Sequence, residues 1–160
     1  GLFSKVLAWC SKPQIAFSML VLLISSLVLV NPFAEKVGSL SYVAVLTEQT
    51  GQAHLVASTY GESKKLVVNV VKAPKVLSDQ DLELWVISKT DGEARSLGVI
   101  SQEQGLVEQQ LSDAQWRLIK DSDYLIVTIE ETGGSAIGEP SDVIVSRGLC
   151  VRLEAWQKNA

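Results

Sequence analysis

The stretch Leu82-Glu-Leu-Trp-Val-Ile-Ser88 decides the fold of the longer part of this chain, because its apolar side chains alternate. In an extended strand, the two leucines and Val86 share one face, while Trp85 and Ile87 share the other. An Asp91-Gly92 turn follows, and a second apolar segment comes directly after it. A strand, a tight turn and another strand in this order predict an antiparallel hairpin.

Other segments repeat this period of two between polar turns. They are 41–47, 53–59, 65–71, 96–100, 124–130 and 142–147. Short β-branched strands at regular spacing predict an all-β antiparallel sandwich. Residues 112–120 differ, because a serine N-cap, helix formers and a basic end predict one short helix. The stretch 149–154 alternates again and fits either a last edge strand or a loose tail.

Residues 15–34 form the second strong signal, an apolar run that carries no charge. A helix of about 20 residues is roughly 30 Å long, close to the thickness of a bilayer's hydrocarbon core. A buried core helix fits poorly, because the run is apolar on every face. A cleaved signal peptide fits the basic start at Lys5 and Lys12, but Pro32 stands where a small residue is needed before the cut. We therefore expect an uncleaved, single transmembrane α-helix over 13–34.

The basic residues around this run set the expected topology. Lys5 and Lys12 precede it, whereas Lys36 follows it next to Glu35. The positive-inside rule then places the N-terminus in the cytoplasm. The expected parts are a cytoplasmic juxtamembrane segment 1–12, the transmembrane helix 13–34, a stalk 35–40, an extracytoplasmic β-sandwich domain 41–154 and a tail 155–160.

Composition excludes several classes of function. The 160 residues carry a formal net charge of −4, which argues against a nucleic-acid partner, since such proteins favour basic faces. Cys10 and Cys150 lie on opposite sides of the expected span, so they cannot pair within one chain. With one histidine and no Cys-x-x-Cys motif, we expect no metal and no cofactor.

The sequence also predicts no catalytic residues, and therefore no enzyme. His54 is the only imidazole, and we expect it on a strand, at the surface or half-buried, rather than beside a nucleophile. Gly133-Gly134 lacks the strand-to-helix setting and the lysine of a phosphate-binding loop, so it predicts a surface loop. We expect Trp85 and Trp116 to anchor the core. Glycoside chemistry needs a carboxylate pair, and no spacing singles one out among Asp79, Asp81, Glu130 and Glu131.

Two groups of motifs occur in a fixed order. In the first, the Leu-x-Leu-Trp strand at 82–88 precedes Ser96-Leu-Gly98. In the second, a strand ends in Glu130, and a Gly-Gly-Ser loop, Pro140 and the strand 143–145 follow. This ordered set, with the transmembrane helix before it, resembles the C-terminal domain of the anti-sigma-K factor (RskA-type) family of bacteria over about 42–148.

The resemblance implies a single-pass regulator of the bacterial inner membrane. A cytoplasmic domain of the family holds an ECF-type sigma factor inactive, and the outer domain controls stepwise proteolysis that releases it. Expected partners are therefore membrane lipid, envelope proteases and a sigma factor. About a dozen residues precede Pro13, so we expect the sigma-binding domain to be missing from this chain. The alternative is an anchored structural or assembly subunit of an envelope complex.

Overall fold

The computed structural model describes residues 38–100, 102–103 and 105–153. In this part of the chain, no helix is long and apolar enough to cross a membrane. The predicted transmembrane helix 13–34, the segment 1–12 and the tail 155–160 lie outside the described residues. The elements are β1 (Leu40–Thr47), β2 (Ala53–Tyr60), β3 (Lys65–Val70), β4 (Gln80–Ser88), β5 (Ala94–Ile100), β6 (Gly105–Gln110), α3 (Asp113–Lys120), β7 (Ser122–Glu131), β8 (Ile144–Leu149) and β9 (Val151–Arg152).

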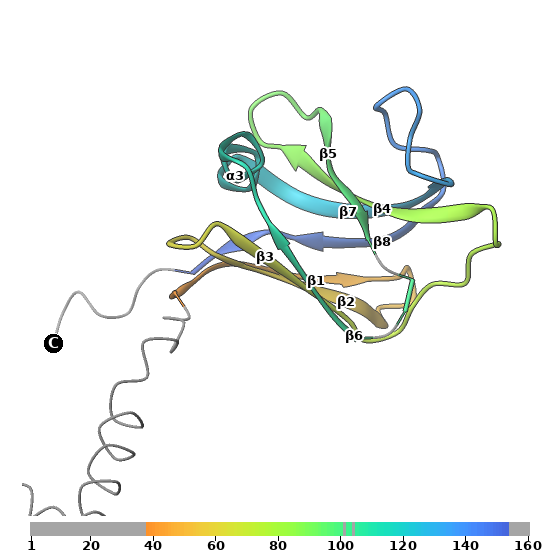
Figure 1. Cartoon of the computed structure of the whole chain (residues 1–160), viewed down its shortest axis with the longest axis horizontal. Coiled ribbons are helices and arrows are strands. Elements are labelled where there is room, and N and C mark those ends of the chain that lie inside the picture. The colour runs from red at the N-terminus through yellow and green to blue at the C-terminus, as the bar shows by residue number, and fades with distance from the viewer. Residues whose placement is uncertain (1–37, 101, 104, 154–160) are drawn as a thin grey trace, which may run out of the picture. The chain divides into compact units, whose positions relative to one another are not determined.

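All the strands belong to one sheet, in the order β5-β4-β7-β8-β1-β2-β3-β6, with β9 beside β1. Every pair is antiparallel, which confirms the predicted class. The predicted sandwich of two sheets is replaced by a single, nearly closed, barrel-like sheet (Figure 1). At the open seam, Gln109 Nε2 on β6 donates to Leu97 O on β5 at 3.0 Å, so a side chain bridges the two edge strands.

Strands β8 and β1 join the two halves of the sheet at a close approach. Thr47 on β1 and Arg147 on β8 are the one pair of residues that lie opposite each other in the ladder between these strands. One residue later, a Cβ on Gly148 would lie 2.2 Å from Val45 O. Only glycine lets the two backbones come this near, because any side chain would overlap the Val45 carbonyl. The two halves therefore continue as one sheet at this point, where a sandwich would have two separate sheets.

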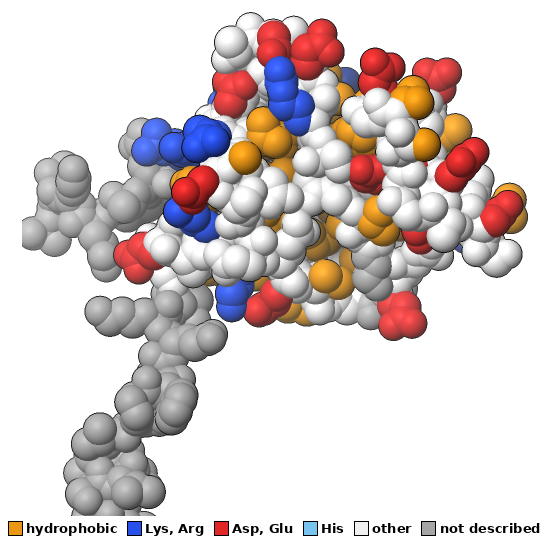
Figure 2. All heavy atoms as spheres, turned by 45° about the horizontal axis from the view of Figure 1, so that its top comes forward, with side chains coloured by type: hydrophobic (Ala, Val, Ile, Leu, Met, Phe, Trp, Pro, Cys, Tyr) orange, Lys and Arg blue, Asp and Glu red, His pale blue; other side chains and the backbone are white. Residues whose placement is uncertain are grey.

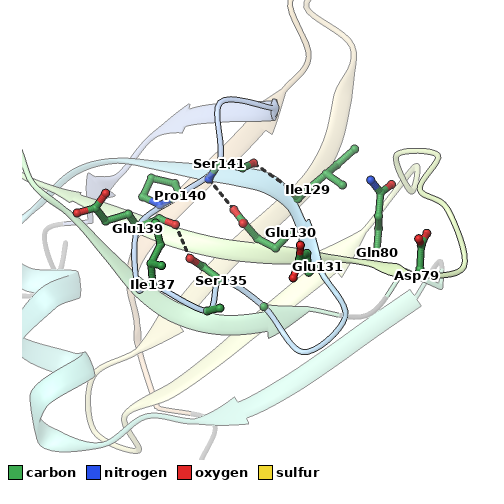
Figure 3. A pocket seen from close by; sticks show the side chains of 12 residues that line it. Asp79, Gln80, Ile129, Glu130, Glu131, Ser135, Ile137, Glu139, Pro140 and Ser141 are labelled. Carbon is green, nitrogen blue, oxygen red and sulfur yellow. Dashed lines mark hydrogen bonds between the residues drawn. The ribbon is translucent and has the colours of Figure 1, made fainter.

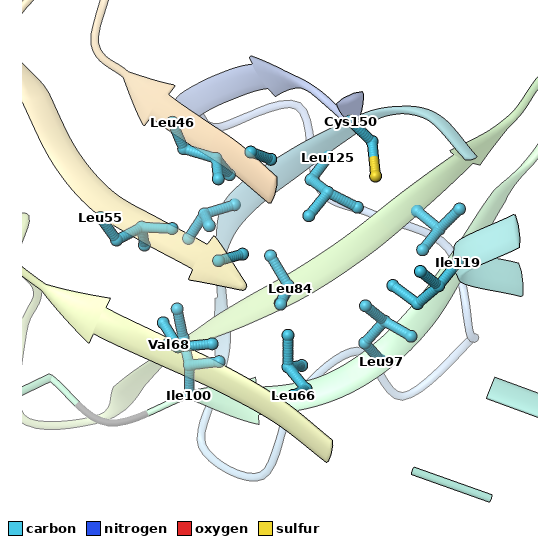
Figure 4. Packing of buried hydrophobic residues seen from close by; sticks show 14 of the residues in the cluster. Leu46, Leu55, Leu66, Val68, Leu84, Leu97, Ile100, Ile119, Leu125 and Cys150 are labelled. Atoms are coloured by element: carbon cyan, nitrogen blue, oxygen red, sulfur yellow. The ribbon is translucent and has the colours of Figure 1, made fainter. Parts of the chain in front are cut away.

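One apolar core fills the space between the halves. Leu46, Leu55 and Leu66 point inward from β1, β2 and β3, and they meet Leu84 from β4 and Leu125 from β7 (Figure 4). Each of these side chains is at most 2% exposed. Burying a leucine fully is worth about 1.5–3 kcal/mol, so this cluster supplies much of the domain's stability. The inward residues of β4 are those that the sequence alternation predicts.

Helix α3 closes one end of the barrel-like sheet. Ser112 forms the predicted N-cap: its Oγ accepts from Gln115 N at 3.2 Å, and Gln115 Oε1 accepts from Ser112 N at 3.0 Å. Ile119 inserts into the core and is fully buried. The Trp116 ring meets the Tyr42 ring edge to face, with 5.8 Å between centroids, and this contact fixes α3 beside the start of β1.

The sequence did not predict strand β6. Its side chains are exposed or half-buried along its length, and Leu106 is 63% exposed. Because β6 is an edge strand with polar residues on both faces, the alternation that reveals the other strands is absent. The position of β6 in the sheet is fixed by its antiparallel pairing with β3, in which Val107 lies opposite Val68.

The approach at Gly148 predicts a large effect of one methyl group. Gly148→Ala should lower the free energy of unfolding by about 3 kcal/mol or more, because the new Cβ meets backbone that cannot move aside. Gly51→Ala is the control: its φ is +87° but nothing lies within 4 Å, so the cost should be about 1–2 kcal/mol. Urea unfolding of the detergent-solubilised chain, followed by tryptophan fluorescence, measures both. Equal losses would contradict the close-approach argument.

Candidate functional site

The two groups of motif residues meet on the outer face of β4, β5 and β7. Strand β4 is buried on both faces from Leu82 to Ser88. Its inward side chains join the core, and its outward Trp85 packs with Ile87 and Ile126 in a second, smaller cluster. The glycine-rich loop 132–143, which connects β7 to β8, lies against this region (Figure 3). This arrangement confirms the predicted surface loop.

Three carboxylates of the sheet accept backbone N–H groups from this loop. Asp81 on β4 accepts from Gly133 N at 2.8 Å, and Glu83 on the same strand accepts from Ser135 N at 2.7 Å. Glu130 on β7 accepts from Ser141 N at 2.8 Å. Hydrogen bonds to a charged acceptor are stronger than neutral ones. The loop is therefore held at both of its ends, and we call this set of contacts the loop clamp.

Each clamp carboxylate also accepts a hydrogen bond from a side chain, which comes from β5, from β7 or from the loop between β5 and β6. Ser96 Oγ donates to Glu83, and Gln102 Nε2 donates to Asp81 at 3.1 Å. Thr128 Oγ1 donates to Glu130 and itself accepts from Trp85 Nε1 at 2.8 Å. Buried polar groups are stable only when they are paired, and these pairings account for the burial of both glutamates.

The tryptophan of the first motif and the loop of the second are therefore parts of one hydrogen-bonded chain. It runs from Trp85 through Thr128 and Glu130 to the backbone of Ser141. Trp85 and Thr128 are fully buried, which confirms that Trp85 is an anchor of the interior.

Gly134 is needed where the loop meets Glu83. Its φ is +95°, a region that side chains disfavour, and a Cβ would lie 2.8 Å from Glu83 Oε2 and 3.1 Å from Val99 Cγ2. The glycine thus lets the loop backbone reach the carboxylate.

The Ser-Leu-Gly motif of β5 forms a β-bulge. Trp85 pairs with Ser96 and Leu84 pairs with Gly98, so Leu97 is the extra residue. Gly98 adopts a φ of +117°. The bulge sends the Leu97 side chain into the core, and the Leu97 carbonyl accepts from Gln109 and from Gln115 Nε2 at 3.3 Å. The motif therefore shapes the edge strand at the open seam.

A hollow of about 530 Å³ lies beside the clamp. Acidic side chains dominate its polar lining, namely Asp79, Glu130, Glu131 and Glu139. Ser141 Oγ donates to Ile129 O at 2.7 Å, so this hydroxyl also supports the loop. Among the described residues, no group of three or more His, Cys, Asp or Glu side chains could hold a metal ion. The Glu130 carboxylate and the Ser141 hydroxyl in this hollow both hold the loop in place. The expected absence of catalytic residues stays a prediction.

His54 lies in the interior, which corrects the expectation of a surface or half-buried residue. Leu46 pairs with Leu55 while Thr47 pairs with Ala53, so His54 is the extra residue of a bulge in β2. A bulge redirects a side chain, and His54 is only 6% exposed. The period of two could not reveal this, because it assumes an uninterrupted strand.

The His54 ring connects two distant segments. Nδ1 lies 2.7 Å from Ser146 Oγ on β8, and Nε2 lies 3.2 Å from Glu48 Oε2 in the β1–β2 turn. Thr50 Oγ1 donates to Glu48, and this hydrogen bond holds the pKa of the Glu48 carboxyl below its ordinary value. Glu48 therefore stays an ionised acceptor for the imidazole at neutral pH.

Serine, histidine and glutamate in contact have the residue types of a hydrolase triad, but the nucleophile position is closed. Ser146 is 2% exposed, and it does not line the neighbouring hollow of about 370 Å³, which His54 and Glu48 border. A substrate carbonyl cannot approach an oxygen enclosed by the core. The arrangement therefore ties the β1–β2 turn to β8.

Sequence reasoning missed Glu83, the central carboxylate of the clamp. It named Asp81 and Glu130 only as members of an unpaired set, and the register places these two opposite each other on β4 and β7. One signal was present: Glu83 is an ionisable residue inside an otherwise apolar strand. Such a residue needs a partner when it is buried, and the partner here is a backbone amide of a distant loop.

The clamp lies within the part of the chain that matches a known protein family. A family model described as "Anti-sigma-K factor rskA, C-terminal" matches residues 15–144. The matched range runs from the apolar segment through the clamp loop to the first residue of β8. No curated protein and no solved structure matches the chain.

The clamp predicts that Glu83 stabilises the loop specifically. Glu83→Ala should lower the free energy of unfolding by about 2 kcal/mol and speed hydrogen exchange at Ser135, because two donors lose a charged acceptor. Glu131→Ala, a change of the same kind at an exposed carboxylate of β7, should stay within about 0.5 kcal/mol. The clamp is refuted if Ser135 exchanges equally slowly in both variants.

The closed serine predicts that Ser146 does not react. A fluorophosphonate probe, which labels activated serines, should leave Ser146 unmodified in the folded chain, since its oxygen is enclosed. A known serine hydrolase treated in parallel shows that the probe is active, and peptide mass spectrometry reads the site. Labelling of Ser146 that disappears in His54→Gln would contradict a purely structural role.

Proposed function

The chain belongs to the family of the anti-sigma-K factor RskA C-terminal domain, and on that premise we propose that it is a membrane-anchored regulator of an ECF-type sigma factor. The barrel-like domain lies outside the cytoplasm and controls the proteolytic release of the sigma factor. The observation that carries this proposal is the extent of the family match, which covers most of the predicted span and most of the domain. Members of this family regulate transcription, and the sigma factor is the partner that the family implies.

Control of proteolysis requires that the folded domain restrict access to the chain near the membrane. Gly38 is buried, and a Cβ there would lie 3.2 Å from Glu62 Cβ in the β2–β3 turn. Ser41 Oγ accepts from Gly61 N at 3.0 Å and donates to Ser39 O at 3.2 Å. The last residues of the stalk are therefore attached to the domain.

Strand β1 is also enclosed on both edges. It pairs with β2 along most of its length, and β8 and β9 pair with its other edge. Leu153 N donates to Ser41 O at 2.9 Å, which extends this cover to the start of the strand. A protease must bind an extended, unpaired segment, so cleavage here needs local or global opening of the sheet. The rate of release then follows the stability of the domain.

Shielding predicts that loss of the core accelerates cleavage. Trp85→Asp places a charge in a fully buried site, which should unfold the domain and shorten the half-life of the full-length protein several-fold. Ile137→Asp is the matched control, because Ile137 is 80% exposed in the loop. A pulse-chase of the tagged protein in its host measures both half-lives. If the half-life of Trp85→Asp equals that of the unmodified chain, the shielding proposal is wrong.

The identity of the partner is tested separately. Immunoprecipitation of the natural full-length protein from solubilised membranes should recover a sigma factor. Recovery of a large envelope assembly without any sigma factor would instead support a structural subunit.

A further inference from the structure

The charged residues of the described domain are distributed unevenly between the two ends of the sheet. The entry end is where β1 begins, together with the β2–β3 turn, α3 and β9. The loop end holds the turn 48–52 and the loops 71–79, 101–104 and 132–143. The loop end is strongly acidic: it carries Lys72 and Lys75 against Glu48, Asp79, Asp81, Glu103, Glu130, Glu131, Glu139 and Asp142.

At the entry end, which also includes the β4–β5 turn, cations and anions are balanced: the cations are Lys64, Lys65, Lys89, Arg117, Lys120 and Arg152, and the anions are Glu62, Asp91, Glu93, Asp113, Asp121 and Asp123. Lys64 pairs with Asp113 at 2.5 Å. Arg117 and Lys120 on α3 and Arg152 on β9 are exposed. Figure 2 shows the Lys and Arg side chains of this face mostly on its left half, with Asp and Glu side chains among them, while the charged side chains of the right half are mostly Asp and Glu.

Exposed apolar side chains accompany these cations. Leu149 is 67% exposed, Val151 50%, Leu153 38% and Leu40 37%. They come from the end of β8, from β9 and the residue after it, and from the start of β1. Together with Arg117, Lys120 and Arg152 they form what we call the entry patch.

Three contacts hold the entry patch together. Arg152 pairs with Tyr42 in the sheet, and the Tyr42 ring touches Trp116 on α3. Leu153 N donates to Ser41 O, next to the first residue of β1. The helix and the two strands therefore present their basic and apolar side chains from one rigid unit.

On the proposed anchoring, the length of the chain connection limits how far the entry end can lie from the membrane. Residues 35–37 separate the expected span 13–34 from Gly38. An extended chain covers at most about 3.6 Å per residue, so Gly38 lies within about 15 Å of the end of the span. The entry end must therefore stay near the bilayer, and this step rests on the proposed membrane anchoring.

We propose that the entry patch contacts the anionic phospholipid headgroups of the bilayer that anchors the chain. Arg117, Lys120 and Arg152 face the lipid phosphates, and the exposed leucines and Val151 enter the boundary between headgroups and acyl chains. The acidic loop end is repelled from the same surface, so the two ends favour one orientation. The short tether raises the local concentration of lipid, which makes a weak patch sufficient. Seated in this way, the domain restricts protease access to the start of β1.

Labelled full-length chain in lipid nanodiscs tests this orientation. In a Cys10→Ser background, a fluorophore is attached through Ser63→Cys at the entry end or through Ile137→Cys at the loop end. Headgroup spin-labelled lipid should quench the Ser63→Cys label about twofold more in discs containing phosphatidylglycerol than in pure phosphatidylcholine discs. This gain should vanish when salt shortens the Debye length to about 3 Å. The Ile137→Cys label should not respond to lipid charge.

Two variants with equal changes in net charge separate the patch from general electrostatics. Lys120→Glu/Arg152→Glu should abolish the gain, whereas Lys72→Glu/Lys75→Glu, at the loop end, should leave it intact. Arg152→Glu alone, at an exposed position of a two-residue strand, should reduce the gain if the double variant does not fold. Equal quenching in both lipids, or equal loss in both double variants, overturns the proposal. If the chain does not float with the discs at all, the anchoring itself fails, and this inference fails with it.

Discussion

The close approach of Gly148 on β8 to the Val45 carbonyl on β1 is the constraint on which the rest of the domain depends. It joins two groups of strands into one sheet and makes them curl around a common core. Without this contact, the leucines of β1–β3 would have no fixed partners on β4 and β7. The His54–Ser146 contact lies two residues from the same point on β8, so polar and steric constraints act together there.

Carboxylates in this domain are used to position backbone. Asp81, Glu83 and Glu130 accept N–H groups from a loop with several glycines, and a loop of that kind loses much conformational entropy on ordering. The clamp therefore offsets an entropic cost, and through Thr128 it is hydrogen-bonded to the buried Trp85. A domain that regulates through its own stability benefits from such contacts, because each one changes how often the sheet opens.

The chain belongs to an anti-sigma factor family, and under the proposed control of proteolysis several of its features serve one purpose. The attachment of Gly38 and Ser41 to the domain, the enclosure of β1 and the basic, apolar entry end all concern the place where the chain leaves the sheet. Strand β1, which contacts Gly148 of β8, therefore also contains the segment that we propose to be protected from proteolysis. Stability of the core and accessibility of the stalk are physically coupled through β1.

Alternating residues were enough to predict the antiparallel class and most strands, and other local patterns predicted the N-cap at Ser112 and the surface loop at Gly133, since these features depend on neighbours in the chain. Two bulges broke that pattern, at His54 and at Leu97, and an edge strand without alternation escaped it. The closure at Gly148 and the meeting of Glu83 with Ser135 join residues far apart in sequence. Local periodicity states which face a side chain occupies, but only tertiary packing decides which distant backbone meets it.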